Sequence, residues 1–574
     1  MIYRLILLIT ILFSPLSVFA ANSNNKFGIH LAQPNIEEFS KVKDLVNSNG
    51  GDWGYITLII EEKDRNKDKW QGIFNQLRAL HLIPIIRLAT SAVGENWQRP
   101  EKKDAQDWVD FLDSLNWVVK NRYVILFNEP NHGSEWGGEI DEKSYAEVSF
   151  EFAKKLKEKN PDFFIMLAGF DASAPSWAPG LEDEEAFLNK MFKSETRNSK
   201  LETNFNFKNS NFENCFEFSA SCFEFLIDGW ASHSYPNPGF SGSPYAVGRG
   251  TVRTYEWELG LLKELGVSKE LPVFITETGW KRGSEQIIAD NFQTAYNQIW
   301  LPDDRVKAVT PFIFDYQGPP FLEFSWKPPS AKASEGQEFY QQYYSVQSMS
   351  KIKGEPEQRE KGWISYQLPT DLVVHSTYHF KVQLNNLGQA VWDKDSNYGL
   401  RITDYGLKTP EYLFDDLKDV NPFEEKDVYF TLKTNEDLGK KKIKFILQKN
   451  DENILESEDW NINILPLPSL KFETWGRGND YEIQIWDVDD RIVFKKKNIS
   501  IKQGAGELKN IQNIALDELY RVVLLKPYYL PRQEFVVFKK DNNKVKFKFL
   551  LPFDFNNDGA FDFKDIISIF KKPN

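Results

Sequence analysis

The stretch ILFNEPNHGSEWGG, residues 125–138, passes from an apolar run directly into Asn128, Glu129 and Pro130. Pro130 cannot donate a hydrogen bond to a strand ladder, so we expect a strand to end here. An ionisable carboxylate, Glu129, then stands at the end of a buried strand. Strands also end in polar residues for purely structural reasons, and a functional interpretation therefore needs a second carboxylate in a similar setting.

Seven further apolar runs resemble the one before Glu129, and amphipathic stretches such as residues 104–120, 144–160 and 251–266 separate several of them. Strands that are apolar throughout and alternate with helices indicate a parallel sheet covered on its outer face. Eight such units favour an α/β fold of the closed (β/α)8 TIM barrel type, with a doubly wound open sheet as the alternative. The runs are FGIHLA (27–32), WGYITLII (53–60), LIPIIRLA (82–89), YVILFNEP (123–130), FFIMLAGF (163–170), GWASHSYP (229–236), PVFITETGW (272–280) and VTPFIFDY (309–316).

The second carboxylate is Glu277, in VFITETGW at the end of the seventh run. Active sites of such barrels lie at the carboxyl ends of the strands. Glu129 and Glu277 are therefore expected to face each other across the barrel mouth. His30 and Asp171 also end strands, and we interpret each of them as a structural polar group.

Two carboxylates across a cleft are the minimum required to cleave a glycosidic bond, one as proton donor and one as an ionised nucleophile or stabiliser. NEP at the fourth strand end with TETGW at the seventh resembles the retaining glycoside hydrolases of clan A, over roughly residues 26–345. That clan includes cellulases, mannanases, endo-β-1,3-glucanases and β-xylosidases. The resemblance implies a polysaccharide or oligosaccharide substrate and no cofactor for catalysis. The alternative is a non-catalytic carbohydrate-binding or cell-envelope protein.

By this resemblance, Glu129 would be the acid/base, Glu277 the nucleophile, and Asn128 the partner of the sugar 2-hydroxyl. Tyr235 would donate to Glu277, and His233 would lie beside Glu129 or the sugar. Arg87 would lower the pKa of Glu277, because a nearby positive charge lowers the pKa of a carboxyl group.

Many clan members carry a tryptophan at the end of strand eight, where this chain has FIFDYQ (312–317). Trp326, or Trp280 beside the nucleophile, is the candidate for the missing sugar platform. This departure leaves the family within the clan, and hence the sugar, open.

The first twenty residues read as a secretory signal peptide, with one charge at Arg4, an apolar run and a small-residue site ending at Ala20. An uncleaved anchor is the alternative, but the apolar run is shorter than the roughly 20 residues that span a bilayer. We therefore expect a secreted or cell-surface protein without a transmembrane segment after cleavage. Cys215 and Cys222 are the only cysteines, and a disulfide and two buried thiols are both compatible with them.

The chain carries 70 Lys and Arg against 83 Asp and Glu, a net charge of −13, and no basic cluster interleaved with aromatics. Nucleic acid is therefore excluded as the expected partner.

The length of 574 residues requires several domains. We assign residues 21–348 to the barrel, with a loop-like excursion at 192–222. A charged linker, EPEQREKG (355–362), leads into strand-length alternating segments typical of a β-sandwich. Residues 349–466 form this module, and VQLNNLGQAVW (382–392) resembles immunoglobulin-like modules. A second small sandwich is expected over 467–550.

The tail, residues 551–574, contains DFNNDGAFDFKD with oxygen ligands at the spacing of a Ca²⁺ loop. The loop resembles a dockerin repeat, although dockerins usually carry two repeats and this chain has one. It predicts a bound Ca²⁺ and, through the tail, a cell-surface or cohesin-like partner. The expected ligands are Asp554, Asn556, Asp558, the Ala560 carbonyl and Asp565, with Gly559 at the turn and Asp562 at position 9.

Overall fold

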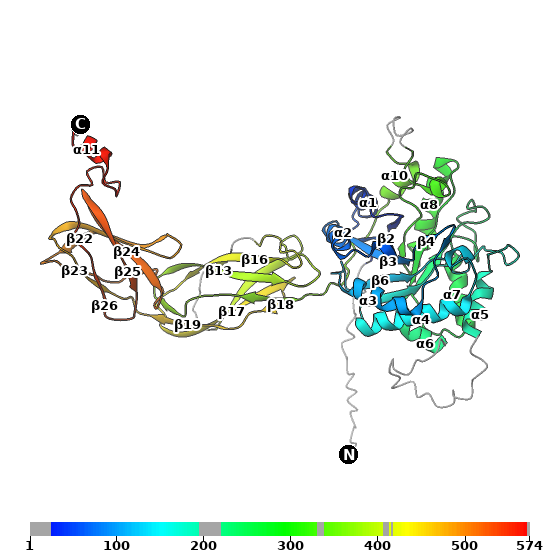
Figure 1. Cartoon of the computed structure of the whole chain (residues 1–574), viewed down its shortest axis with the longest axis horizontal. Helices are drawn as coiled ribbons and strands as arrows, with labels where there is room; N and C mark the ends of the chain where they lie inside the picture. The colour runs from blue at the N-terminus through cyan, green and yellow to red at the C-terminus, as the bar shows by residue number, and fades with distance from the viewer. Residues whose placement is uncertain (1–23, 194–219, 330–337, 406–411, 415–416, 571–574) are drawn as a thin grey trace, which may run out of the picture. The chain divides into compact units, whose positions relative to one another are not determined.

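The computed structural model describes residues 24–193, 220–329, 338–405, 412–414 and 417–570. The chain divides into two compact units, Met1–Arg359 and Glu360–Asn574 (Figure 1). The expected signal peptide, most of the 192–222 excursion and Cys215 lie outside the described residues. Cys222 is a disulfide cysteine.

The first unit is built on parallel strands that correspond to the expected runs. One sheet has the order β1-β2-β3-β6-β7 and the other β10-β9-β8. Parallel bridges join Phe27 to Val309 and Met166 to Gly229, so pairing continues from each sheet into the next. Within the described residues the pairing forms a ring of eight strands: β1 (Gly28–Leu31), β2 (Gly54–Glu61), β3 (Leu82–Ala89), β6 (Arg122–Leu126), β7 (Phe163–Leu167), β8 (Trp230–His233), β9 (Val273–Glu277) and β10 (Val306–Val309).

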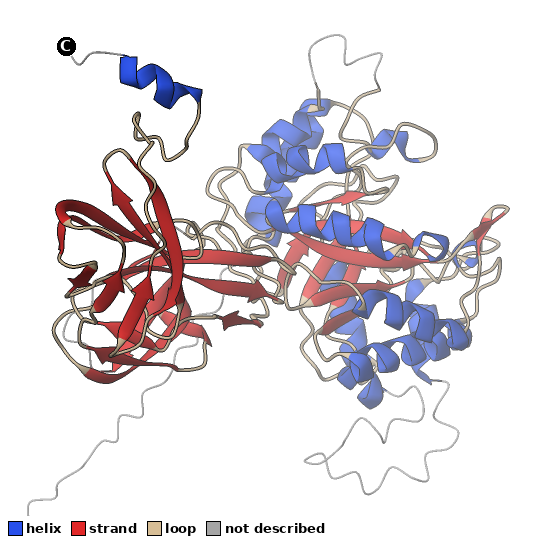
Figure 2. Cartoon of the chain, turned by 60° about the vertical axis from the view of Figure 1, so that its left-hand side comes forward, coloured by secondary structure: helices blue, strands red, loops and turns tan. Residues whose placement is uncertain are grey.

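Helices follow the strands along the chain and cover the outer side of the sheets (Figure 2). In α4, Tyr145, Val148, Phe152 and Leu156 are buried at helical spacing, and the Asp141 side chain caps the first turn by accepting from the Ser144 N–H. The helices are α1 (Phe39–Val46), α2 (Lys67–Ala79), α3 (Ala105–Asp113), α4 (Glu142–Lys159), α5 (Glu184–Lys193), α6 (Ala220–Leu226), α7 (Thr254–Glu264), α8 (Glu285–Ala295) and α10 (Gln341–Gln347).

Short elements add to the first unit. Strands β4 (Ala92–Val93) and β5 (Asn96–Trp97) pair in a two-stranded antiparallel hairpin. A π-helical turn, η7 (Tyr296–Trp300), continues α8, and 3-10 turns are η1 (Ile36–Glu38), η2 (Glu62–Asp64), η3 (Lys102–Asp104), η4 (Gly133–Glu135) and η8 (Phe321–Phe324).

The bounds of the last strand, and the end of the first unit, differ from expectation. Strand β10 is Val306–Val309, upstream of most of the predicted run, and Pro311, two residues after Val309, has no N–H to continue the ladder. The presumed linker packs on the first unit: Lys120 N–H donates to the Glu357 carbonyl at 2.8 Å, and Arg359 binds Asp162. The first unit therefore extends to Arg359 instead of ending at residue 348.

The second unit contains two hydrophobic cores among its described residues. The first lies between the sheets β11-β13-β16-β15 and β12-β19-β17-β14, with β18 paired to β17. Buried Leu384 of β13, Phe430 of β16 and Phe445 of β17 share this core. The strands are β11 (Gly362–Ser365), β12 (Asp371–Val373), β13 (Thr377–Asn386), β14 (Tyr398–Tyr405), β15 (Tyr412–Phe414), β16 (Glu425–Lys433), β17 (Gly439–Lys449), β18 (Glu452–Glu456) and β19 (Trp460–Leu465).

The second core lies between the sheets β23-β20-β26 and β22-β21-β24-β25. Phe472 of β20, Ile483 of β21 and Val522 of β24 belong to it. A short helix, α11 (Phe563–Phe570), follows. The strands are β20 (Leu470–Glu473), β21 (Gly478–Trp486), β22 (Ile492–Ile501), β23 (Ala505–Leu508), β24 (Leu519–Lys526), β25 (Tyr529–Val537) and β26 (Asn543–Lys546).

Among the residues that the structure describes, no helix is both long enough and apolar enough to cross a membrane.

Candidate active site

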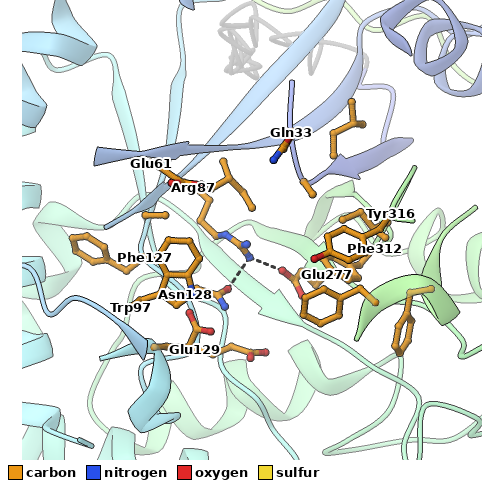
Figure 3. A pocket seen from close by; sticks show the side chains of 18 of the residues that line it. Gln33, Glu61, Arg87, Trp97, Phe127, Asn128, Glu129, Glu277, Phe312 and Tyr316 are labelled. Carbon is orange, nitrogen blue, oxygen red and sulfur yellow. Dashed lines mark hydrogen bonds and ion pairs between the residues drawn. The ribbon is translucent and has the colours of Figure 1, made fainter. Parts of the chain in front are cut away.

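A cleft of about 840 Å³ opens where the strands of the first unit end (Figure 3). Arg87 of β3, Asn128 and Glu129 after β6, and Glu277 of β9 all line it. Parallel strands bring their carboxyl ends to one edge, so residues more than a hundred positions apart meet there.

Glu277 is held by hydrogen-bond donors on both oxygens. Arg87 Nη1 donates to its Oε1 at 2.5 Å, and the Tyr235 hydroxyl donates to its Oε2 at 3.0 Å. His30 Nδ1 lies 3.8 Å from Oε1. Glu277 is only 8% exposed, so these contacts replace most of the water around its carboxylate.

The surroundings of Glu277 favour its ionised form. Burial by itself raises the pKa of a carboxyl group, but His233, Arg87 and His30 together with the Tyr235 hydrogen bond outweigh burial and lower the pKa of Glu277 well below 4.5. Burial and the nearby Arg87 also lower the pKa of His30 to about 3, so His30 is neutral at ordinary pH. Glu277 is therefore a carboxylate at neutral pH.

Glu129 stands on a backbone turn that leaves the strand abruptly. Phe127 has φ +72° and Glu129 has φ +29°, a region that side-chain-bearing residues seldom adopt. Such residues cost of order 1–3 kcal/mol each and persist where the surrounding structure fixes them. The turn is fixed by hydrogen bonds from Glu129 N–H to the Gly169 carbonyl and from His132 N–H to the Glu129 carbonyl.

His233 of β8 joins the two carboxylates. Its Nδ1 lies 2.7 Å from Glu129 Oε1 and 3.9 Å from Glu277 Oε2. Gly169 makes room for the ring, since a Cβ there would lie 2.2 Å from His233 Cδ2. Burial disfavours the charged ring, but Glu277 and Glu129 outweigh burial and raise the pKa of His233 above 6.5.

The two carboxylates are close. The ligand atoms of Glu129, His233 and Glu277 lie within 4.8 Å of one another, so an oxygen of Glu129 is within that distance of an oxygen of Glu277. The same atoms could ligate a metal, but Arg87 already places a cation on Glu277, and His233 already binds Glu129. The donor set fits a network of hydrogen bonds better than a metal site.

Two polar residues of the cleft escaped the sequence interpretation. His132 Nε2 contacts Asp171 Oδ2 at 3.0 Å, and its Nδ1 lies 3.9 Å from Glu129 Oε2. Glu135 lines the same wall. Both His132 and Glu135 belong to the stretch NEPNHGSEW, so their closeness to Glu129 in sequence was the available signal. Asp171 contacts His132 and accepts from the Ser173 N–H, in agreement with its interpretation as a structural polar group.

The expectation that Trp280 and Trp326 form the sugar platform is corrected. They are 5% and 1% exposed, and both rings pack against Phe292 of α8. Neither lines the cleft. Its aromatic lining comes instead from Trp97, Phe127, Tyr235, Phe240, Phe312, Tyr316, Phe321 and Phe324.

The loop from Asp554 to Asp565 is ordered by its own backbone. Asp554 accepts from the N–H groups of Asp558 and Gly559, and Asp565 accepts from those of Asn556 and Asp562. Asp554 and Asp565 are 3% and 0% exposed. Gly559 has φ +87°, which explains glycine at the turn.

The Asp558 carboxylate accepts from the Ala560 N–H and from the Asn556 side chain. All five expected ligand residues therefore belong to one compact turn that leads into α11.

No protein-family model and no curated protein matches this chain. Similar solved structures include a GH39 enzyme from Xanthomonas axonopodis pv. citri, at 14% identity and TM-score 0.33, covering 72% of this chain and 95% of that one. A monomeric beta-xylosidase from Caulobacter crescentus CB15 has 12% identity and TM-score 0.36, covering 88% and 96%. An endo-beta-1,4-mannanase from Thermotoga petrophila has 10% identity and TM-score 0.29, covering 77% and 98%. Similarity this low does not establish a relationship, so function must be argued from the cleft itself.

Proposed function

We propose that the first unit is a (β/α)8 barrel acting as a retaining β-glycoside hydrolase, with Glu277 as nucleophile and Glu129 as acid/base. The observation that carries the proposal is the pair of cleft carboxylates with oxygens within 4.8 Å. Retaining enzymes hold their two carboxyl groups about 5–5.5 Å apart, whereas inverting enzymes need roughly 6.5–9.5 Å to admit a water.

The different surroundings of the two carboxylates suit the two roles. Glu277, bound by Arg87 and Tyr235, is ionised and can attack the anomeric carbon. As the bond to the leaving oxygen breaks, Glu129 gives that oxygen a proton. In the second step Glu129 takes a proton from water, which attacks the same carbon and releases Glu277.

The residues around the pair support this cycle. His233 on Glu129 Oε1 holds that side chain in place, and its ring lies near enough to Glu277 to keep the nucleophile charged. Asn128 accepts a hydrogen bond from Arg87, which also binds Glu277, and is the residue assigned to the sugar 2-hydroxyl. The aromatic lining of the cleft offers flat apolar faces for sugar rings.

The test uses two variants and azide. Glu277→Ala should abolish turnover on every aryl glycoside, because no glycosyl-enzyme can form. Glu129→Ala should still react with a dinitrophenyl glycoside, whose leaving group needs no acid, and added azide should then give the β-glycosyl azide. An α-glycosyl azide from Glu129→Ala would mean that the two roles are exchanged.

The rival proposal is a carbohydrate-binding or cell-envelope protein whose cleft holds glycan without cleaving it. A panel of β-glucans, mannans, xylans and aryl glycosides separates the two, since the rival requires binding of at least one glycan with no product from any. The proposed secretion rests on residues 1–20 alone.

We also propose that the Asp554–Asp565 loop binds Ca²⁺. Its carboxylates are oriented by backbone N–H groups, and the described residues show no Lys or Arg in a salt bridge with Asp554, Asp558 or Asp565. Ca²⁺ prefers such oxygen ligands, and its charge would offset theirs. The ligands would be Asp554, Asn556, Asp558, the Ala560 carbonyl and Asp565.

A further inference from the structure

His132 lines the cleft beside Glu129 but has no part in the double-displacement cycle. It follows Glu129 by three residues and is the N-cap residue of the 3-10 turn η4. Its ring faces a carboxylate at each nitrogen: Nε2 lies 3.0 Å from Asp171 Oδ2, and Nδ1 lies 3.9 Å from Glu129 Oε2. A titratable ring between two carboxylates can influence where protons reside in the cleft.

Backbone and amide contacts hold His132, Glu129 and Asp171 in this arrangement. The His132 N–H donates to the Glu129 carbonyl at 2.8 Å. Asn131, which is buried between them in sequence, donates from Nδ2 to the Asp171 carbonyl at 2.9 Å and accepts from the Asp171 N–H at 3.2 Å. Asp171 Oδ1 accepts from the Ser173 N–H at 2.8 Å, which leaves Oδ2 for the ring of His132.

The contact with Asp171 fixes which nitrogen of His132 is the donor. Burial raises the pKa of Asp171, but the hydrogen bonds from His132 and Ser173 outweigh burial and lower that pKa below 3.8. Asp171 is therefore ionised at neutral pH and accepts, so Nε2 carries a hydrogen. Nδ1 then presents a lone pair to Glu129 when the ring is neutral and an N–H when it is charged.

The pair formed by Glu129 Oε2 and His132 Nδ1 favours a single proton. Two protons would set an O–H against an N–H, and no proton would set a lone pair against a negative charge. One proton, on either atom, avoids both conflicts. The other oxygen of the acid/base, Oε1, already contacts His233 Nδ1 at 2.7 Å, so Oε2 is the oxygen at which His132 acts.

We propose that His132, oriented by Asp171, shares one proton with Glu129, so that the cleft keeps the proton needed by the leaving oxygen up to a higher pH. This inference rests on the proposed function, because the shared proton is the one that Glu129 donates. That proton leaves with the first product and is replaced from the attacking water, so the cycle needs no other donor. His132 forms no bond with the sugar and is a positioning residue that acts through Glu129.

The surroundings of His132 agree with a shared proton. Burial disfavours the charged ring, but the hydrogen bond to Asp171 and the charge of Glu129 outweigh burial and raise the pKa of His132 above 6.5. The His132 side chain is 23% exposed, against 2% for that of His233. His132 can therefore exchange its proton with bulk water, which an equilibrium between the pair and solvent requires.

Other charged groups face the pair from neighbouring elements and stay in place in every variant below. The charge of Glu135, on η4, acts on His132 in the same direction as that of Glu129. The remaining groups are His233 of β8, Arg87 of β3 and Glu277 of β9.

The first test measures the proton without a substrate. The full-length chain has six histidines, and His132→Gln identifies the NMR signal of His132 among them. In a pH titration, Glu129→Gln should lower the pKa of His132 by about one pH unit or more, the size of interaction at which two groups titrate as a pair. Asp171→Asn should also lower it, because a carboxylate that favours the charged ring is lost. An unchanged pKa of His132 in Glu129→Gln would overturn the proposal.

The second test is the pH profile of kcat/KM, which follows the ionisations of the free enzyme. Glutamine at position 132 keeps an N–H for Asp171 but cannot titrate. For an alkyl glycoside, the basic limb in His132→Gln should move to lower pH by about one pH unit, because a carboxyl group alone releases its proton at lower pH than an imidazole does. A dinitrophenyl glycoside needs no acid, so its profile should change little.

The matched control is His81→Gln. His81 Nδ1 contacts Asp52 Oδ1 at 2.9 Å, and neither residue is among the described residues that line the cleft, so the basic limb should stay at its wild-type pH. Equal shifts for both substrates in His132→Gln would overturn the proposal, because His132 would then act on something other than the proton donor. A Glu277→Ala variant that retained turnover would instead overturn the proposed function, and the NMR titration would still decide whether the proton is shared.

Discussion

The cleft and the C-terminal loop both gather carboxylates, but different partners hold them. In the cleft, Glu277 and Glu129 contact ionisable side chains, namely Arg87, Tyr235 and His233. In the loop, Asp554 and Asp565 accept from backbone N–H groups. Side chains that carry protons and charge can adjust a pKa and exchange a proton, whereas backbone amides can only orient an oxygen.

This difference separates two uses of the same functional group. A carboxylate that already has a cation nearby is prepared for chemistry on a neutral molecule such as a sugar. Carboxylates oriented by amides receive no neutralising charge from them, and the proposed Ca²⁺ would offset that negative charge. The predictions below remove one partner at a time, in order of decreasing expected effect.

The largest effect is expected from Arg87, which contacts both Glu277 and Asn128. Arg87→Gln leaves a buried carboxylate without its cation, a change that costs about 3–5 kcal/mol for a buried pair and corresponds to roughly 10³-fold in kcat/KM. Because Arg87 lowers the pKa of Glu277, its removal should raise that pKa. The acidic limb of the pH profile should then move to higher pH.

Arg87→Lys is the control, since it keeps the charge but not the fork that reaches two partners. Steady-state kinetics from pH 3 to 8, a range set by the assay, would measure both variants. An acidic limb at the same pH in Arg87→Gln and the wild type would show that Arg87 does not set the ionisation of Glu277.

The sequence allowed this cluster to be predicted to a considerable depth, because strand ends in a parallel sheet meet at one edge. Arg87, Asn128, Tyr235 and Glu277 could each be placed by the apolar run that precedes it. The role expected of each residue was implied by the resemblance of the NEP and TETGW motifs to clan A glycoside hydrolases.

Contacts between segments without such a pattern could not be predicted. Trp280 and Trp326 looked like platform residues, yet both pack on Phe292, which belongs to a helix between them in sequence. Nothing local distinguishes a core tryptophan from one in a cleft. The pairing of His132 with Asp171 likewise joins residues 39 positions apart.

The next effect concerns the loop. Adding Ca²⁺ at about a hundred times its Kd should stabilise the bound form by roughly 2.7 kcal/mol, so the last twenty or so residues should become resistant to protease. Asp558→Ala should abolish that protection, because it removes a ligand. Asp541→Ala, an exposed aspartate of the same unit, is the control.

Chelation by EDTA should leave the rate of glycoside hydrolysis unchanged, because the cleft carboxylates have their own cation. Digestion that proceeds equally with Ca²⁺ and with EDTA would refute the calcium site. A rate that fell on chelation would contradict the separation between the two clusters.

A further pair of acids, Glu184 and Glu258, lies outside both the cleft and the loop and tests the cost of burying a carboxylate. Glu184 of α5 and Glu258 of α7 are both fully buried and interact with each other. Burial raises the pKa of Glu258 to about 7. A raised pKa means that the folded protein binds the proton more tightly, so stability falls as pH rises from about 4.5 through about 7.

Glu258→Gln removes that ionisation, and should therefore stabilise the fold by roughly 2 kcal/mol at pH 8 and have little effect at pH 4. Thermal unfolding at both pH values measures the difference, with Glu264→Gln on the exposed face of α7 as the control. An equal shift of Tm at both pH values would mean that the benefit comes from packing and not from the buried charge.

A smaller effect on catalysis than that of Arg87→Gln is expected at Tyr235, whose hydroxyl donates to Glu277 Oε2 at 3.0 Å. Tyr235→Phe removes one hydrogen bond from a neutral hydroxyl to the Glu277 carboxylate and leaves Arg87 and His233 near that carboxylate. A hydrogen bond to a charged group contributes about 1.5–3 kcal/mol, so kcat/KM should fall roughly 10- to 100-fold, less than for Arg87→Gln. The Tyr235 bond lowers the pKa of Glu277, so the acidic limb of the pH profile should again move to higher pH, by less than in Arg87→Gln.

The Tyr235 ring also packs against Phe240 and Phe324, and phenylalanine keeps those contacts, so the variant should unfold at the same temperature as the wild type. A loss as large as that of Arg87→Gln would mean that the hydroxyl, and not the guanidinium, is the principal partner of the nucleophile, and the contrast between the cleft and the loop would then not depend on a fixed cation.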